Sequence, residues 1–416
     1  MSKIDILYLS YDGMTDPLGE SQVIPYLKEL SKRGHVISII SFEKKNRFKI
    51  HGDRIKKSLQ ENAIFWSCFF YTKTPPVFST LYDIIRLRKK AKLICKKNNV
   101  DVVHCRSYIA SLVGVFLKKK YAVKFLFDMR GFWADERVEG GLWNLKNPLY
   151  KLVYQFFKKK EIQFLNMSDS TVSLTVNAVN EIRSWKTIRS SLPITVIPCC
   201  VDMELFDRNK INPIIKQNMK IKLGITEDDM VLLYLGSIGT WYLLKEMLLF
   251  FKYLCSSYSN AKFLFVTAEQ RKVILDQAQA MDISPHMLII KESSRQDMPY
   301  YISMAHAAVF FIKPVYSKKA SSPTKQGEIM SMGIPILCNK DIGDTDKIIE
   351  ENNCGAVVSN FSNDSFDDTI KKIDYLTTLD KNKIVETAKN YFSLQHGVEK
   401  YNDIYVSLLK NKHSHK

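Results

Sequence analysis

The stretch Ser321-Ser-Pro-Thr-Lys-Gln-Gly-Glu-Ile-Met-Ser-Met-Gly-Ile-Pro-Ile-Leu-Cys338 predicts a polar loop, a short helix, a tight turn and a buried strand in succession. Ser321, Ser322 and Thr324 supply hydroxyl groups and backbone N–H groups where this helix would begin. A helix start attracts anions, because its first N–H groups lack partners and the helix dipole is positive there. The stretch therefore indicates a loop-to-helix turn that can hold a phosphate.

Two charged residues follow in the same short helix. Lys325 adds a positive charge at its start, and Glu328 lies about one helical turn beyond Thr324 on the same face. A diphosphate beside a carboxylate that accepts hydrogen bonds from sugar hydroxyls is what a nucleotide-sugar site needs. Taken alone, the stretch fits a capped helix with a solvated glutamate equally well, and the rest of the chain decides between the two interpretations.

Apolar strands and amphipathic helices alternate along the chain on both sides of a segment without periodicity, residues 199–213. This rhythm predicts an α/β fold with two Rossmann-like, doubly wound parallel-sheet domains facing a central cleft. The predicted strands are 4–9, 36–41, 101–105, 124–128, 170–173 and 194–198 in the first series, and 231–236, 261–266, 287–290, 307–311, 334–337 and 355–358 in the second.

The predicted domain boundaries follow from these two series. Residues 1–205 form an N-terminal domain, and residues 206–394 form a C-terminal domain. An amphipathic helix over 395–410 packs back on the first domain, and the Lys- and His-rich tail 411–416 is expected to be disordered.

The composition is that of a globular protein in a reducing compartment. The chain has 416 residues, which suits two domains, and no apolar run approaches the roughly 20 residues that span a bilayer. The N-terminus is interpreted as a first strand, not a signal peptide. Eight cysteines without a Cys-x-x-Cys pair argue against a disulfide framework and a zinc site. We expect a cytoplasmic protein.

The net charge of +18 implies an anionic partner, either a phospholipid surface or a nucleic acid. The positive charge gathers in the first half of the chain, with aromatic and aliphatic residues beside the last two clusters. These clusters are 44–49, 86–92, 118–120 and 158–160. Solvated helix faces are the alternative explanation.

Four motifs in the same order and spacing make the chain resemble family 4 of the retaining glycosyltransferases, which have the two-domain GT-B fold. They are DPLGESQVIPYL at 16–27, DMRGFWADER at 128–137, VIPCCVDMELF at 196–206 and the sequence from Glu328 to Met-x-x-Gly-x-Pro at 330–335. The resemblance covers nearly the whole chain. It implies an enzyme that binds its donor in the C-terminal domain and its acceptor against the N-terminal one.

The resemblance assigns donor-binding roles in the second domain. It gives Glu328 the nucleotide ribose, and it gives phosphate and donor sugar to the preceding loop, where Ser321, Ser322, Thr324 and Lys325 stand. The family's first glutamate, eight positions earlier, is replaced by Ala320. Backbone groups of Ser321 and Ser322 are expected to take over its role.

A second departure concerns the cations that neutralise the leaving diphosphate. Many relatives carry an Arg and a Lys in the loop that is Gly236-Ser-Ile-Gly-Thr-Trp-Tyr242 here, where Ser237 is the expected donor contact. Neither cation is present, so Lys325 and Lys313 are the predicted substitutes. The need is physical, because a leaving diphosphate gains negative charge in the transition state.

In the first domain, Asp128 holds the position of the family's active-site histidine. Asp128 is predicted to position the acceptor hydroxyl and accept its proton, and Arg130 to bind a phosphate. An Asp–Arg pair that only stiffens a strand-end loop is the alternative. Trp133 is a further acceptor-binding candidate, and Gly19 stands at a helix start that can approach the donor diphosphate.

No metal and no cofactor is expected. Asp344-Thr-Asp346 looks like the Asp-x-Asp motif that holds a metal in other glycosyltransferases, but here it follows Cys338, where the resemblance implies no metal site. The lysines are expected to neutralise the diphosphate.

These observations together predict a hexosyltransferase-type enzyme that acts with retention on a glycan or lipid-linked acceptor. The basic, aromatic-studded first half favours peripheral docking on the inner face of an anionic cell membrane, in bacterial surface polysaccharide or lipopolysaccharide assembly. A GT-B nucleotide-sugar epimerase or hydrolase, and a non-catalytic basic nucleic-acid binder, are the alternatives. The latter lacks RNA- or DNA-binding motifs. The sequence leaves the donor nucleotide, the sugar and the acceptor open.

Overall fold

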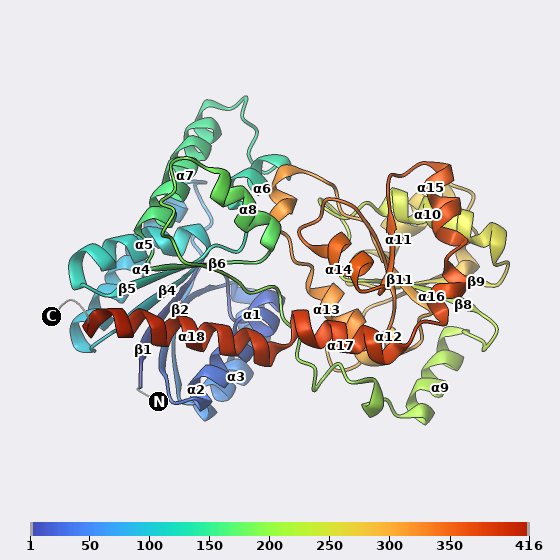
Figure 1. The fold of residues 1–416 in the computed structure, drawn as a ribbon, viewed down its shortest axis with the longest axis horizontal. Coiled ribbons are helices and arrows are strands. Elements are labelled where there is room, and N and C mark those ends of the chain that lie inside the picture. The colour runs from blue at the N-terminus through green and yellow to red at the C-terminus, as the bar shows by residue number, and fades with distance from the viewer. Residues whose placement is uncertain (1–2, 414–416) are drawn as a thin grey trace. The chain divides into compact units, whose positions relative to one another are not determined.

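The computed structural model describes residues 3–413, which fold into two compact units (Figure 1). The first unit ends at Pro198 and is completed by the residues from Leu394 onward, and the second runs from Cys199 to Ser393. The sequence analysis placed the boundary after residue 205. Each unit is built on one parallel sheet with helices around it, as the alternation of strand and helix patterns predicts.

The first sheet has seven strands in the order β3-β2-β1-β4-β5-β6-β7, and its named strands pair in parallel. The strands are β1 Asp5–Ser10, β2 Val36–Glu43, β3 Ile64–Phe70, β4 Val102–Arg106, β5 Lys124–Asp128, β6 Ser170–Ser173 and β7 Ile194–Val196. The helices are α1 Pro17–Gln22, α2 Ile24–Lys32, α3 Lys45–Glu61, α4 Phe78–Lys97, α5 Ser107–Tyr121, α6 Trp133–Glu139, α7 Pro148–Met167, α8 Val176–Ser184 and α18 Leu394–His413.

The second sheet has six strands in the order β10-β9-β8-β11-β12-β13, also parallel. The strands are β8 Met230–Leu235, β9 Ala261–Val266, β10 Leu288–Lys291, β11 Ala307–Phe310, β12 Ile336–Asn339 and β13 Gly355–Val358. The helices are η1 Arg208–Lys210, α9 Pro213–Leu223, α10 Leu244–Ser257, α11 Arg271–Gln279, η2 Pro285–Met287, α12 Met298–Ser303, η3 Tyr316–Ala320, α13 Thr324–Ser331, α14 Thr345–Glu351, α15 Asn363–Ile370, α16 Ile373–Thr377 and α17 Lys381–Phe392.

The predicted α/β class with two Rossmann-like domains is therefore confirmed. Strands such as β4 and β12 are buried along their whole length, because helices cover both faces of a parallel sheet. Their carboxyl ends lie at one edge of each sheet, the edge at which such folds bind ligands. The residues discussed below follow strand ends at these edges.

The structure adds two elements to those predicted. The amphipathic pattern over 22–32 corresponds to α2, and the structure adds a separate short helix, α1, before it; the two helices meet at Val23, which has a φ of −128°. Pro25 lies in the first turn of α2, where its missing N–H is not needed. Strand β3 is absent from the predicted series; it is the edge strand, and its side chains are mostly half-exposed.

The C-terminal helix α18 belongs to the first unit and runs beside α2 (Figure 1). The Nε2 atom of His35 lies 3.0 Å from Oδ1 of Asn402, and the ring of Tyr26 meets that of Tyr401 edge to face. In the structure α18 extends to His413, and the disorder expected over 411–416 stays a prediction. Residues 414–416 lie outside the described part of the chain.

Within residues 3–413, no helix combines the length and the hydropathy that crossing a bilayer requires.

Candidate functional site

The loop after η3 leads into α13, which begins at Thr324 where the sequence analysis expects a helix start. The Oγ atom of Ser322 accepts a hydrogen bond of 3.1 Å from the backbone N–H of Cys199. The backbone N–H of Ser321 donates to the carbonyl of Lys318. Pro323 precedes the helix and provides no side-chain cap. The loop is thus held by its own backbone and by the segment at Cys199.

Lys325 points into a set of aromatic rings, which we call the lysine cage: Tyr234, Tyr242 and Phe310. Its Nζ atom lies 3.6 Å from the ring centroid of Tyr242, 4.2 Å from that of Tyr234 and 5.9 Å from that of Phe310. It also donates a 3.2 Å hydrogen bond to the Tyr234 hydroxyl. Among the described residues, no carboxylate lies within ion-pair distance of Nζ.

Burial dominates the electrostatics of the lysine cage. It lowers the pKa of Lys325 well below the usual value, and the nearby charge of Glu328 only partly opposes this shift. Burial likewise raises the pKa of Tyr242 to about 12. Rings around an ammonium stabilise it through cation–π attraction, but they do not neutralise its charge. The Lys325 side chain therefore has no carboxylate at ion-pair distance among the described residues, and its burial disfavours the charged form until an anion binds.

The loop after β8 approaches the lysine cage at Gly236, which has no side chain. Gly236 has a φ of +105°, and a Cβ placed there would lie 3.3 Å from the Nζ atom of Lys325. The hydroxyl of Tyr234 donates a 2.5 Å hydrogen bond to the carbonyl of Ser237, the predicted donor contact. A residue with a side chain at position 236 would be strained and would crowd the ammonium, so glycine suits both the turn and the close approach.

Glu328 is buried and paired with Arg295, a residue that the sequence analysis missed. The Nη1 atom of Arg295 lies 2.8 Å from Oε1 of Glu328, and its guanidinium lies over the ring of Phe206 at 5.2 Å. Burial raises the pKa of Glu328, with Arg295 and Lys325 acting in the opposite direction. Within residues 3–413 no hydrogen bond to its Oε2 atom is seen, so this oxygen can accept one from a hydroxyl. The only sequence signal for Arg295 was its place in the loop after β10.

The second predicted cation, Lys313, lies outside the lysine cage. Its side chain is exposed, and its backbone N–H donates to the carbonyl of Trp241 at 2.8 Å. Lys318, which the sequence analysis did not single out, is buried with its Nζ atom 3.7 Å from the ring centroid of Trp241. Ala320, where the resemblance leads one to expect a glutamate, is buried.

In the Asp344-Thr-Asp346 segment, the Asp346 carboxylate is engaged by nearby backbone N–H groups. The Asp346 carboxylate accepts hydrogen bonds of 3.0 Å from the N–H groups of Asp341 and Lys347. Over residues 3–413, no group of three His, Cys, Asp or Glu side chains is arranged to hold a metal ion. Whether the reaction needs a metal stays a prediction.

In the first unit, Asp128 is the centre of a buried cluster at the end of β5. Its Oδ2 atom accepts a 3.2 Å hydrogen bond from Tyr401 and lies 3.4 Å from Nε2 of His104. The guanidinium groups of Arg106 and Arg130 lie 3.8 Å and 3.9 Å from its oxygens. Its Oδ1 atom is buried and accepts no hydrogen bond from the described residues.

Opposing effects set the protonation of this cluster. Burial disfavours the Asp128 carboxylate, but the charge of Arg130, the hydrogen bond from His104 and the charge of Arg106 hold its pKa below the usual range. Burial lowers the pKa of His104, whose Nδ1 lies 2.7 Å from the Tyr405 hydroxyl. At neutral pH the cluster therefore contains an ionised aspartate and a neutral histidine.

The other predicted acceptor residues lie close by in sequence. Arg130 adopts a left-handed backbone conformation, with a φ of 59°, which turns the chain sharply after β5. Trp133 is stacked on Tyr108 at 5.7 Å and meets Trp143 and Phe157 edge to face. This packing orients the indole ring within an aromatic cluster.

Gly19 lies where only a glycine fits. A Cβ at this position would come within 2.2 Å of the Gly13 carbonyl oxygen. The loop that it touches is anchored by the buried Glu43, whose carboxylate accepts hydrogen bonds from the N–H groups of Met14 and Thr15 and from the hydroxyls of Thr15 and Ser41. The strand-to-helix turn at the start of the chain is thus rigidly held.

Two family models match the chain, each over one of its units. The family described as Glycosyltransferase Family 4 matches residues 20–205, and the family described as Glycosyl transferases group 1 matches residues 215–390. Together they cover most of the sequence. No curated protein matches the chain.

Solved structures with the same fold cover nearly the whole chain at low sequence identity. A glycosyltransferase from Rickettsia africae is 19% identical, with 99% of this chain and 100% of that one covered and a TM-score of 0.73. HepE from Anabaena, in complex with UDP and glucose, is 13% identical, with 97% and 100% covered and a TM-score of 0.67. WaaG, a glycosyltransferase involved in lipopolysaccharide biosynthesis, is 14% identical, with 96% and 99% covered and a TM-score of 0.68.

The likeness to these structures shows the GT-B fold, and the family models show the kind of enzyme. Each of the two family matches falls mainly on one of the two parallel-sheet units. This chain belongs to the group 1 glycosyltransferases and is a transferase of the GT-B fold.

Proposed function

We propose that this enzyme transfers a sugar, with retention, from a nucleotide-sugar donor to a glycan or lipid-linked acceptor in bacterial surface polysaccharide or lipopolysaccharide assembly. The observation that carries the donor half is the lysine cage, a buried ammonium without a paired carboxylate among the described residues. Burying an unpaired charge is unfavourable, so a site that keeps one is a candidate for an anionic ligand. That HepE is described with UDP and glucose supports this choice of donor class.

The proposed reaction assigns a task to each part of the donor site. The bond between the anomeric carbon and the diphosphate oxygen breaks, and Lys325 meets the charge that develops on the leaving group. The acceptor oxygen forms the new bond on the same face. Its proton passes to the leaving phosphate, so that atoms and charge balance without a further reactant. Glu328, oriented by Arg295, accepts hydrogen bonds from the ribose hydroxyls.

A panel of nucleoside diphosphates and nucleotide sugars tests the donor half. We expect at least one nucleoside diphosphate to raise the melting temperature without added metal, because a ligand that binds only the folded state stabilises it by mass action. Glu328→Ala is expected to abolish the shift. Measurement is by thermal unfolding, with Glu351→Ala, an exposed glutamate at the end of α14, as the matched control.

A panel without any shift, or an equal shift in the Glu328→Ala chain, would contradict the donor-site assignment. A shift that appears only with magnesium would overturn the expectation that no metal is needed.

The acceptor half of the proposal rests on one face of α4, here called the α4 outer face: Phe78, Leu81, Tyr82, Ile85, Lys89, Lys92, Leu93 and Lys96. These residues recur at helical spacing, and the five apolar ones are each about half exposed or more, from 48% to 66%. The opposite face buries Ser79, Asp83, Leu87 and Ala91. A helix with an exposed apolar stripe and interspersed lysines suits the interface of an anionic bilayer.

We therefore propose peripheral docking at the cytoplasmic face of the cell membrane. None of the eight cysteines, all of which lie in the described part of the chain, forms a disulfide, which suits a reducing compartment. Because α4 belongs to the first unit, docking through it would bring the proposed acceptor-binding unit to the membrane that carries a lipid-linked acceptor.

Replacing Leu81 and Ile85 with serine is expected to weaken binding to anionic vesicles by at least about tenfold, because two apolar side chains no longer enter the interface. Binding is measured by vesicle co-sedimentation at two salt concentrations. Ile214→Ser with Ile221→Ser removes two exposed isoleucines from α9 and is the matched control. Salt-steep binding to duplex DNA without vesicle binding would favour a nucleic-acid partner instead.

A further inference from the structure

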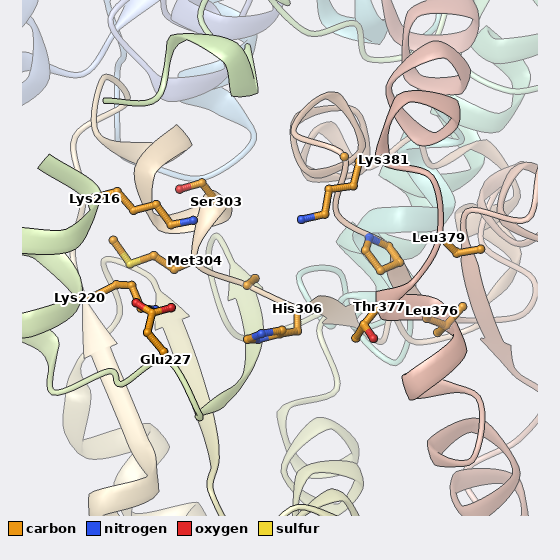
Figure 2. Close-up of a pocket in the computed structure, with 13 residues that line it drawn as sticks. Lys216, Lys220, Glu227, Ser303, Met304, His306, Leu376, Thr377, Leu379 and Lys381 are labelled. Atoms are coloured by element: carbon orange, nitrogen blue, oxygen red, sulfur yellow. The ribbon is translucent and has the colours of Figure 1, made fainter. Parts of the chain in front are cut away.

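A second pocket lies in the second unit, at the amino-terminal edge of its sheet (Figure 2). His306 immediately precedes β11, Pro335 immediately precedes β12, and Glu227 lies just before β8. The lysine cage is built at the opposite edge, where Gly236 follows β8. The pocket encloses about 150 Å³, and none of its lining residues belongs to the lysine cage, so it is separate from the donor site.

The pocket carries more positive than negative charge. Its walls include Lys216 and Lys220 from α9 and Lys381, the first residue of α17, but a single acid, Glu227. Lys220 pairs with Glu227 at 2.8 Å. In the part of the chain that the structure describes, no carboxylate lies within ion-pair distance of Lys216 or Lys381. Two ammonium groups thus remain unbalanced.

The two unbalanced lysines extend toward one another from opposite sides of the pocket (Figure 2). Partial burial, together with the charges of Lys220 and Lys381, lowers the pKa of Lys216. Asp229 and Asp380 are engaged with backbone, since Asp229 accepts from the N–H of Thr226 and Asp380 from the N–H of Asn382. Lys216 is half-buried and Lys381 is exposed, and two like charges that face one pocket repel each other unless an anion binds between them.

His306 and Gly333 also line the pocket. The backbone N–H of Val231 donates a 3.0 Å hydrogen bond to Nδ1 of His306, so the neutral ring carries its proton on Nε2 and can donate. Gly333 has a φ of +72°, and a Cβ there would come within 2.9 Å of the Cβ of Lys381. The absence of a side chain at 333 lets Lys381 approach the pocket.

We propose that this pocket binds a phosphate group, either as inorganic phosphate or as the phosphomonoester of a small metabolite. The charge of a phosphate dianion matches the two unbalanced ammonium groups, and lysines and imidazole N–H groups are suitable donors to its oxygens. A volume of about 150 Å³ admits such a group with the first atoms of its substituent. Because the pocket and the lysine cage lie at opposite edges of one sheet, both can be filled at once.

The test compares a pocket variant with a matched control. Lys216→Gln with Lys381→Gln removes the two unbalanced charges, whereas Lys222→Gln with Lys383→Gln removes two charges from the same helices that do not line the pocket. The pocket variant is expected to fold, since it relieves repulsion. Phosphate and glycerol 3-phosphate are titrated at constant ionic strength and followed by calorimetry.

The wild type and the control are expected to bind phosphate equally, and the pocket variant at least about tenfold more weakly, because two charge-assisted hydrogen bonds are lost. In the wild type, bound phosphate is expected to raise the pKa of His306, measured by NMR, since an adjacent anion favours the imidazolium. Equal phosphate binding by pocket variant and control, or an unchanged His306 titration, would overturn the proposal.

A further arm identifies the source of the phosphate. Vesicles that contain phosphatidic acid are added to the wild type and to the pocket variant. A free metabolite is supported if only the soluble phosphates distinguish the two chains, and a lipid headgroup if the vesicles distinguish them as well. Nucleoside diphosphate binding is measured in parallel, and it is expected to be unchanged in the pocket variant, so the outcome is independent of the donor site.

Discussion

A Lys325→Met chain is expected to lose at least about a hundredfold in the rate of sugar transfer, the size of effect seen when one group that stabilises transition-state charge is removed. Its free energy of unfolding at neutral pH is expected to equal or exceed that of the wild type. The two effects are opposite in sign because the buried ammonium is unpaired until the donor diphosphate arrives.

The packing of the lysine cage is the reason that methionine is expected to be tolerated at position 325. Methionine is similar in length to lysine and apolar, and replacing a buried charge with a hydrophobic side chain of similar volume is often neutral or stabilising. The Tyr234 hydroxyl keeps its hydrogen bond to the Ser237 carbonyl when the lysine is gone. No buried polar group is therefore left without a partner by the substitution.

The pH dependence has a defined sign. Burial lowers the pKa of Lys325 well below 10.5, whereas in the unfolded chain it titrates at that value. Between these two pKa values the unfolded state binds more protons, so this residue makes the wild type more stable as the pH rises across that window. The Met variant lacks this slope, and its advantage is expected to shrink toward pH 10.5.

Urea unfolding at several pH values and a transfer assay with the donor found in the panel measure both effects. Lys347→Met, which removes an exposed lysine from α14, is the control and is expected to change neither. Strong destabilisation of the Lys325→Met chain at neutral pH, or transfer at the wild-type rate, would show that the ammonium is structural.

Much of the fold was predictable because buried parallel strands are recognisable in a sequence as short apolar runs. Strands such as 124–128 and 261–266 match their predicted ranges. Strand β3 was missed because Ile64–Phe70 is a short apolar run at the sheet edge, where periodicity separates strand from helix poorly. The division of α1 from α2 depends on backbone angles at Val23, which no side-chain pattern records.

The candidate site was predictable only in part, since partners distant in sequence carry no local signal. The helix start at Thr324 is predicted by its own residues. Arg295, by contrast, follows β10 and meets Glu328 of α13 only through the tertiary packing of the second unit. Likewise, the hydroxyls of Tyr401 and Tyr405 enter the Asp128 cluster from α18, hundreds of residues away. Such contacts arise from tertiary packing.

Asp128→Asn is expected to lower the free energy of unfolding at pH 7 by about 3 kcal/mol, the loss typical of removing one partner from a buried ion pair. The amide keeps the volume of the carboxylate but not its charge, so the buried Arg106 and the largely buried side chain of Arg130 lose the anion that lies near both. Arg106 retains Asp12 at 3.5 Å, but that aspartate is about half exposed and compensates little.

The destabilisation has a pH signature. The Arg130 and Arg106 charges and the His104 hydrogen bond outweigh burial and hold the pKa of Asp128 below its usual 3.8. Its contribution to stability is therefore complete above pH 3.8 and is lost as the pH falls through the lower, folded-state pKa. The gap between wild type and variant is expected to close below pH 3.8, because a protonated aspartate resembles asparagine.

Urea unfolding across this range distinguishes the cluster from an ordinary surface pair. Asp368→Asn breaks an exposed contact with Lys371 and is expected to cost less than about 1 kcal/mol at any pH.

We further propose that the buried Oδ1 of Asp128, which accepts no hydrogen bond from the described residues, receives the acceptor hydroxyl. If so, the folded Asp128→Asn chain transfers sugar at least about tenfold more slowly, since a misplaced reacting group alone can cost more. A folded variant with full activity would leave Asp128 as a stabilising residue and exclude it from acceptor positioning.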